Sequence, residues 1–194
     1  MEFEFRPAGV CTRKMNISLA PDGTIEELSF TGGCNGNTKG VAALAKGLPA
    51  EEVMLRFRGI LCGRKDTSCP DQLAEALDEA LEELPDYEFG HAGHGPAYQN
   101  TGGPVFHYTP HGTCSRGIDI RLSEDGVIEE VQFTGGCPGN TQGVAELCRG
   151  KTAEEVIAKL LGTRCGLRGT SCPDQLARAL TMALEQQKKE KETA

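Results

Sequence analysis

The sequence contains no tryptophan, and only 5% of its 194 residues are aromatic. A unit with so few large aromatic side chains builds a small hydrophobic core, which a bound metal often supplements. The sequence also lacks any run of about 18 apolar residues, the length that a membrane-spanning helix needs. Its first residues, Met1 to Arg6, do not have the basic-then-apolar order of a secretory signal. We therefore expect a soluble, cytoplasmic globular protein with no membrane partner.

Positive charge is in deficit, because 20 Lys and Arg face 28 Asp and Glu, for a formal net charge of -8. A chain of this charge repels phosphate backbones, so non-specific nucleic-acid binding is disfavoured. Cysteine, in contrast, is abundant, with nine residues. Disulfides are rare in reducing compartments, where clustered thiols more often hold metals or perform redox chemistry. The cysteines are therefore the first candidates for function.

The chain repeats itself without a gap at an offset of 103 residues. Eight of the nine cysteines follow the repeat, as the pairs Cys11 and Cys114, Cys34 and Cys137, Cys62 and Cys165, and Cys69 and Cys172. The ninth, Cys148, has Ala45 as its counterpart, so we expect it to fill core space on a helix. The repeat predicts two small units, over residues 1–84 and 105–186, followed by a charged tail over 187–194.

Residues 85–104 between the units are rich in glycine and proline, which predicts a linker. His91 and His94 in this segment have a spacing with which they could clasp a metal, although solvated loop histidines are the simpler interpretation.

Each unit is predicted to be α+β, with an antiparallel sheet covered by three helices. In the first copy, alternating apolar residues from Met15 to Leu19 meet an Asp-Gly turn, which predicts a hairpin with a bulge near Glu26. Phe3 and Phe5 suggest a further strand. Helices are predicted over 38–46, 50–58 and 70–84, the last with an apolar stripe that faces the sheet.

Two cysteines of each unit are placed at predicted helix starts. Cys34 lies in a glycine-rich turn before a helix that Asn37 is expected to cap, and Cys69 is expected at the cap of the long helix before Pro70. Helix starts stabilise thiolates over thiols. Cys11 and Cys62 lie in loops. If the four loops meet at one end, each unit has four thiolates for zinc or an iron-sulfur cluster.

The spacing alone leaves three interpretations open, because neither copy contains a Cys-x-x-Cys pair. The first is metal or cluster ligation by all four cysteines. The second is catalytic or redox thiols, for which Cys62 and Cys69 are the expected exchanging pair. The third is a set of structural disulfides or inert buried thiols, which a cytoplasmic location disfavours.

The motifs Phe-Thr-Gly-Gly-Cys-x-Gly-Asn and Thr-Ser-Cys-Pro-Asp-Gln-Leu-Ala, present in both copies, resemble the TSCPD domain family. Members occur alone or as the C-terminal part of some adenosylcobalamin-dependent ribonucleotide reductases. The resemblance implies an association with ribonucleoside-diphosphate reductase and deoxyribonucleotide synthesis, with a reductase catalytic subunit as partner and cobalamin present only through that partner. Because ribonucleotide reduction needs a large barrel, two such small units are not expected to catalyse it alone.

A fainter resemblance is to iron-sulfur scaffolds of the IscU/NifU type, which also place cysteines before a hairpin, at a helix-opening turn and at a long helix. Here the matching residues are Cys11, Cys34 and Cys69, with Cys114, Cys137 and Cys172 in the second copy. The scaffold's aspartate after its first cysteine is absent, and Ser68 and Ser171 replace its histidine. Together the observations predict two α+β units related by a pseudo-twofold axis, each with one zinc or iron-sulfur site made by its own four cysteines.

Overall fold

The computed structural model describes residues 1–90 and 102–193, and each unit in it combines a three-stranded sheet with three helices. The first unit comprises β1 (Glu2–Phe5), β2 (Thr12–Leu19), β3 (Ile25–Gly32), α1 (Asn35–Ala45), α2 (Ala50–Phe57) and α3 (Cys69–Glu82). The second comprises β4 (Val105–Tyr108), β5 (Ser115–Leu122), β6 (Ile128–Gly135), α4 (Pro138–Cys148), α5 (Ala153–Leu160) and α6 (Cys172–Glu192). The predicted α+β class with two tandem units is confirmed.

Both sheets are antiparallel, with strand orders β1-β2-β3 and β4-β5-β6. The register shifts between Ser18, which pairs with Glu27, and Leu19, which pairs with Ile25, so Glu26 is the extra residue of a bulge. This is the predicted bulge. A second irregularity lies between Thr12 and Lys14, close to the cysteine turn. The added strand expected at Phe3 and Phe5 is β1.

The helix starts differ from the prediction at both cysteine turns. The first helix begins at Asn35, and Cys34 occupies the N-cap position expected for Asn37. The long helix begins at Cys69, and its cap is Ser68, whose Oγ accepts a hydrogen bond of 3.1 Å from the Asp71 amide. A serine hydroxyl is a strong N-cap acceptor, which explains why Ser68, rather than Cys69, caps this helix.

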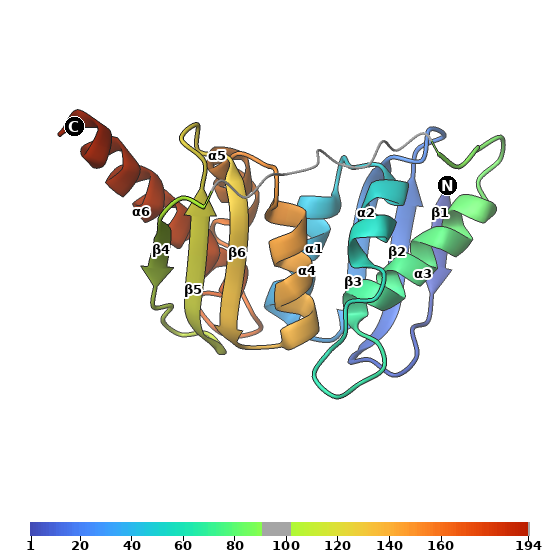
Figure 1. Cartoon of the computed structure of the whole chain (residues 1–194). Coiled ribbons are helices and arrows are strands. Elements are labelled where there is room, and N and C mark those ends of the chain that lie inside the picture. Colours follow the sequence, from blue (N-terminus) through green and yellow to red (C-terminus); the bar gives the residue numbers. More distant parts are fainter. Residues whose placement is uncertain (91–101, 194) are drawn as a thin grey trace.

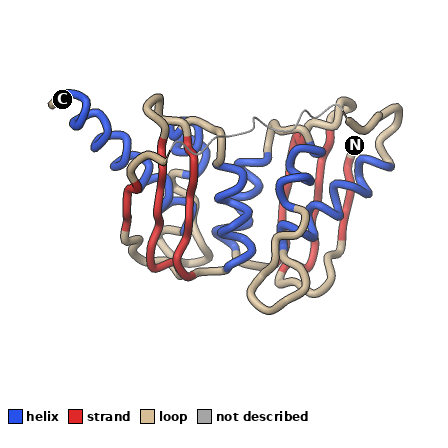
Figure 2. Tube along the Cα trace, viewed as in Figure 1, coloured by secondary structure: helices blue, strands red, loops and turns tan. Residues whose placement is uncertain are grey.

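The two sheets lie at opposite sides of the molecule, and helices of both units lie between them (Figure 2). The expected stripe on α3 is buried against β2, at residues Leu73, Ala76, Leu77, Ala80 and Leu81. Cys148 is completely buried in the same hydrophobic core, where burial raises the pKa of its thiol. This confirms its expected role as core filler.

The central helices α1 and α4 run side by side where the two units meet (Figure 1). Each carries two glycines one turn apart, and these glycines face the other unit. A Cβ at Gly36 would lie 2.7 Å from the Cβ of Ser171, and one at Gly143 would lie 2.7 Å from Cγ of Pro70. Only glycine permits this approach, so the interface depends on the Gly-x-x-x-Gly spacing.

The contacts between the units occur in equivalent pairs, as in a twofold-symmetric dimer. The Arg56 guanidinium donates hydrogen bonds of 2.8 and 3.2 Å to the carbonyls of Glu146 and Arg149 at the end of α4. Its counterpart Lys159 donates a hydrogen bond of 3.3 Å to the Lys46 carbonyl at the end of α1. Each unit therefore satisfies free carbonyls at a helix end of the other.

The predicted linker lies mostly outside the described residues, as do His91 and His94. The predicted charged tail continues α6 as far as Glu192. Within residues 1–90 and 102–193, no helix is both long enough and apolar enough to cross a membrane.

Candidate functional site: cysteines at the interface of the two units

Four helices begin with a cysteine at or beside their first residue. Cys34 and Cys137 are the N-caps of α1 and α4, and Cys69 and Cys172 are the first residues of α3 and α6. Unpaired amides at helix starts create a partial positive charge. This charge favours an anionic centre bound at these positions.

Cys34 and Cys137, from different units, are in direct contact. Their Sγ atoms are hydrogen-bonded at 2.8 Å, which is longer than the roughly 2.05 Å of a disulfide. Sharing this hydrogen bond lowers the pKa of Cys34, and it raises the pKa of Cys137, which burial raises further. The contact therefore couples the titration of the two thiols.

Cys69 and Cys172 are buried, and each accepts a hydrogen bond from a hydroxyl on the strand that opens the hairpin. The Thr12 hydroxyl lies 3.2 Å from Sγ of Cys69, and the Ser115 hydroxyl lies 2.9 Å from Sγ of Cys172. Such hydrogen bonds orient the sulfur. The chain keeps a hydroxyl at the same place in both copies.

Cys11 and Cys114 are exposed, and each lies beside a cation from the loop before the long helix. Nζ of Lys65 is 3.7 Å from Sγ of Cys11, and Nη1 of Arg168 is 3.3 Å from Sγ of Cys114. The site therefore has positive groups around it although the chain carries a net charge of -8.

Cys62 and Cys165 are half-buried at the start of tight loops. Each loop is closed by a backbone hydrogen bond, from the Cys62 amide to the Thr67 carbonyl at 3.3 Å and from the Cys165 amide to the Thr170 carbonyl at 3.2 Å. Both loops lie against the helix start of the other unit: a Cβ at Gly139 would be 3.0 Å from the Cβ of Cys62. The structure therefore places these two cysteines at the interface between the units.

A pocket of about 450 Å³ opens between the two units at this point. Its size falls within the range of small-ligand sites, about 300–1,000 Å³. The cysteines in its wall are Cys34, Cys114, Cys137, Cys165 and Cys172, so one belongs to the first unit and four to the second. That the four repeated cysteines of each unit form a separate site stays a prediction. Cysteines of both units line this one pocket.

The donor set fits a thiophilic metal, because cysteine sulfurs are the ligands of structural zinc and of iron-sulfur clusters. Among the described residues, no group of three or more His, Cys, Asp or Glu side chains is already arranged to hold an ion. Two thiolates on one tetrahedral zinc lie about 3.8 Å apart, given Zn-S bonds near 2.3 Å. Cys34 and Cys137, at 2.8 Å, would therefore have to move apart by roughly 1 Å to share an ion.

Two aspartates hold the cysteine loops against the long helices, a role the sequence analysis did not assign. Asp174 is almost completely buried, and its carboxylate accepts hydrogen bonds from the Gly162 amide at 2.7 Å and the Thr170 hydroxyl at 2.6 Å. Asp71 accepts the equivalent bonds from Gly59 and Thr67, both at 2.7 Å. The aspartate of the Thr-Ser-Cys-Pro-Asp motif therefore positions the preceding loop, which contains Cys62 in the first unit and Cys165 in the second.

Replacing Asp174 with asparagine is expected to destabilise the protein by about 1–3 kcal/mol at neutral pH, because a buried charge-assisted network is lost. Burial alone would raise the pKa of Asp174, but hydrogen bonds from Thr170, Arg178 and Gly162 outweigh burial and lower it. A lowered carboxyl pKa contributes stability above the unfolded value near 3.9, and this stability is lost as the pH falls through the lower folded value. Urea unfolding of D174N and wild type at pH 7 and in acid measures this.

The two curves should converge in acid, below the folded pKa of Asp174. A matched control is Asp66→Asn, which removes an exposed carboxylate from the corresponding loop of the first unit and should change little. A pH-independent difference between D174N and wild type would contradict the assigned role of the carboxylate.

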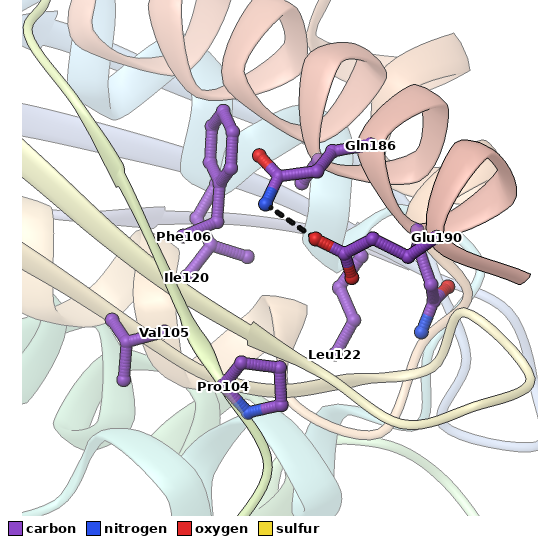
Figure 3. A pocket seen from close by; sticks show the side chains of 9 residues that line it. Pro104, Val105, Phe106, Ile120, Leu122, Gln186 and Glu190 are labelled. Atoms are coloured by element: carbon purple, nitrogen blue, oxygen red, sulfur yellow. Dashed lines mark hydrogen bonds between the residues drawn. The ribbon is translucent and has the colours of Figure 1, made fainter. Parts of the chain in front are cut away.

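A second hollow lies between β4 and α6, away from the cysteines (Figure 3). Phe106, Ile120 and Leu122 line one side, and Gln186 donates a hydrogen bond of 2.8 Å to Glu190 on the other. Its volume of about 50 Å³ holds little more than a water molecule. It is too small for a metabolite.

The sequence analysis did not assign a role to several residues at the site, although each has a counterpart in the other copy. The interface glycines repeat at Gly36, Gly40, Gly139 and Gly143, and the sulfur-bonded hydroxyls and cations repeat at Thr12, Ser115, Lys65 and Arg168. The same or a chemically similar residue recurs at an offset of 103 residues, and this recurrence could have identified them. Ser68 stands where the IscU/NifU-type scaffolds have a histidine, and in this structure it is the N-cap of α3.

These features define a cysteine-rich tandem-repeat protein with a cysteine-lined pocket between its two units. The sequence profile of the TSCPD domain matches residues 3–81 and 97–184, so the chain belongs to the TSCPD domain family. No curated protein matches the chain, and no solved structure does. The fainter IscU/NifU resemblance therefore stays a prediction.

Proposed function

We propose that this chain is a cytoplasmic metal-binding accessory module of ribonucleotide reduction, with zinc or an iron-sulfur cluster held by its paired cysteines. The observation that carries the metal proposal is the contact between Cys34 and Cys137, at 2.8 Å, at the meeting point of two cysteine-capped helices. Cys114, Cys165 and Cys172 line the same pocket as this contact. Sulfur-rich sites of this kind suit soft or borderline metals.

The electrostatics of the site support an anionic centre. Four thiolates around Zn²⁺ carry a net charge of -2, and the helix starts and nearby cations offset it. Lys65 and Arg168 each lie within hydrogen-bonding reach of a cysteine sulfur. Hydroxyls on Cys69 and Cys172 supply the outer hydrogen bonds that orient metal-bound thiolates.

The proposed link to ribonucleotide reduction is supported by membership of the TSCPD family. Members of this family form the C-terminal part of some cobalamin-dependent reductases. Residues 1–90 and 102–193 form two three-stranded sheets with helices and no barrel that could enclose a nucleotide and cobalamin. The role we propose for them is therefore accessory, beside a catalytic subunit that supplies the cobalamin.

Elemental analysis of protein purified under reducing, anoxic conditions tests the metal proposal. We expect zinc or iron at about one ion or cluster per four repeated cysteines. Replacement of Cys148 by alanine is the matched control, since this buried cysteine lies in the core and should leave the metal content unchanged. Less than about 0.2 equivalents of either metal per chain would contradict the proposal, because structural sites bind far more tightly than purification conditions can strip.

Binding to a cobalamin-dependent reductase catalytic subunit tests the accessory role separately. We expect the metal-loaded chain to bind a catalytic subunit lacking its own TSCPD part, and to bind a subunit that retains this part more weakly. Biolayer interferometry with both subunits measures the difference. Equal binding to both subunits, or no binding, would contradict the partner assignment but would not bear on the metal-binding proposal.

A thiol-disulfide redox protein is the second candidate, and the contact between Cys34 and Cys137 is the observation that favours it. Oxidation of this pair would form one S-S bond and pass two electrons and two protons to a disulfide of a partner protein. The pair predicted from the sequence, Cys62 and Cys69, stays a prediction. Thiol titration before and after mild oxidation separates the candidates: a redox pair loses two thiols reversibly, whereas a metal site protects its cysteines.

A further inference from the structure

We infer that the pocket between the two units binds a small disulfide that carries carboxylate groups, and that Cys34 and Cys137 exchange thiols with this molecule. The inference rests on the redox function proposed for this pair, and it names a small molecule, rather than a partner protein, as the substrate. Three features of the pocket support it: the contact between the two sulfurs, the charge of the wall and a buried amide without a partner.

The sulfur pair lies in the wall of the pocket. Sγ of Cys34 and Sγ of Cys137 are 2.8 Å apart, and both residues line the cavity of about 450 Å³. Because a disulfide bond measures about 2.05 Å, the two sulfurs need to approach by only about 0.8 Å to close one. A cavity of this size admits a small ligand as a whole. The pocket therefore brings such a ligand directly to the pair.

The charge of the wall favours an anionic ligand. The chain contains 28 Asp and Glu, but none of them is among the described residues that line this pocket, and Arg168 is the one charged side chain there. Nη1 of Arg168 lies 3.3 Å from Sγ of Cys114, another residue of the wall. A guanidinium group pairs with a carboxylate and repels an ammonium group.

The start of α1 supplies further donors to the same pocket. Asn35, Gly36 and Asn37 line it, and the first amide with a helical hydrogen bond is that of Thr38, which donates to the Cys34 carbonyl at 3.0 Å. The first turn of α1 contains no acidic side chain. Amides that precede the first helical hydrogen bond are free to bind carboxylates and phosphates.

The side chain of Asn37 points to a ligand independently of the helix start. Asn37 is only 5% exposed and lines the pocket, yet its side-chain amide has no hydrogen-bond partner within residues 1–90 and 102–193. In the second unit the equivalent Asn140 is buried too, but its Nδ2 lies 4.0 Å from Sγ of Cys137, at the limit of a hydrogen bond to sulfur. Buried polar groups in proteins are nearly always hydrogen-bonded. A ligand in the pocket gives the amide of Asn37 the partner that the chain does not.

These groups together select a ligand with sulfur in one part and negative charge in another. An inorganic anion would pair with Arg168 and Asn37 but would leave the sulfur pair unused. A neutral disulfide would reach the sulfurs but would leave the charged and polar groups of the wall without a partner. A disulfide with a carboxylate a few atoms from its sulfur satisfies both.

The exchange consists of two displacements at sulfur. One sulfur of the pair bonds to a sulfur of the ligand, and the S-S bond of the ligand breaks to release the first small thiol. The other sulfur of the pair then displaces the second small thiol and closes the disulfide between Cys34 and Cys137. The ligand gains two electrons and the two protons that the cysteines lose, so that one small disulfide becomes two thiols.

Three small disulfides of similar size but different charge test the inference on the full, reduced chain. Dithiodipropionate carries two carboxylates, hydroxyethyl disulfide carries no charge, and cystamine carries two ammonium groups. Mass spectrometry of alkylated peptides measures how fast the disulfide between Cys34 and Cys137 forms, and each rate is divided by the rate of the same compound with a short cysteine peptide. We expect the rate with dithiodipropionate to saturate with concentration and to exceed the other two by about tenfold or more.

Arg168→Gln should lower the rate with dithiodipropionate by about tenfold and leave the rate with hydroxyethyl disulfide unchanged. The matched control is Arg164→Gln, which removes an exposed arginine of the same loop that does not line the pocket and should react like wild type with all three compounds. Equal rates for the three compounds, with the pair still oxidised by the disulfide of oxidised thioredoxin, would overturn the small-molecule substrate but not the redox function. If none of these oxidants formed the disulfide between Cys34 and Cys137, both would be overturned.

Discussion

Alanine at both Gly36 and Gly139 is expected to force the two units apart and to lower the free energy of unfolding by about 2–5 kcal/mol. The added Cβ atoms would lie 2.7 Å from the Cβ atoms of Ser171 and Ser68, respectively. These neighbours are close to the backbone at helix starts, so they cannot rotate away. Urea unfolding of the double variant, beside wild type, measures the loss.

The matched control is Gly169→Ala, since a Cβ at Gly169 meets no atom within 4 Å. This variant should unfold within about 0.5 kcal/mol of wild type. The glycine double variant should also lose metal, because the displaced loops contain Cys62 and Cys165. Unfolding of G36A/G139A at the wild-type urea concentration would show that the interface does not depend on the close approach seen in the structure.

Removal of the metal is expected to have the other large effect. Binding to the folded state alone stabilises a protein in proportion to the logarithm of the affinity, and structural thiolate sites bind tightly. A loss of roughly 5 kcal/mol, at about 2–4 °C per kcal/mol for a chain of this size, lowers Tm by about 10–20 °C. Differential scanning calorimetry with and without a strong chelator measures the shift.

The variant C34S/C137S is the control for metal removal, because each proposed site loses its helix-cap cysteine. Its Tm should already be low, and chelator should change it by no more than a few degrees. If chelator left the Tm of wild type unchanged, the core and the interface glycines alone would account for its stability, and the cysteines would have no structural role.

The repeat and the local patterns allowed most of the fold to be predicted. Alternation from Met15 to Leu19 and the stripe on α3 are decided by burial on one face, which a single sequence displays. The predicted N-cap residues were wrong, because a neighbouring residue occupies the N-cap position in each case. Cys34 precedes Asn37 by three residues and takes the N-cap of α1, and the Ser68 hydroxyl binds the Asp71 amide.

The contact between cysteines of the two units could not be predicted from either copy alone. Analysing each repeat as a self-contained unit grouped Cys11, Cys34, Cys62 and Cys69 together, because sequence order places them in one unit. The contact of Cys34 with Cys137 and the loop over Gly36 depend on how the units pack. Such contacts follow from the complementary shapes of two surfaces, and the repeated Gly-x-x-x-Gly spacing was the one local sign of them.

X-ray absorption spectroscopy of the full chain, purified under reducing and anoxic conditions, tests the central claim most directly. For zinc, the account predicts a metal edge with about four sulfur neighbours near 2.3 Å and no nitrogen or oxygen shell. For an iron-sulfur cluster, the account predicts an iron edge with an all-sulfur shell. A first shell of nitrogen or oxygen near 2.0–2.2 Å, or no metal edge at all, would contradict the claim that these cysteines form a metal site.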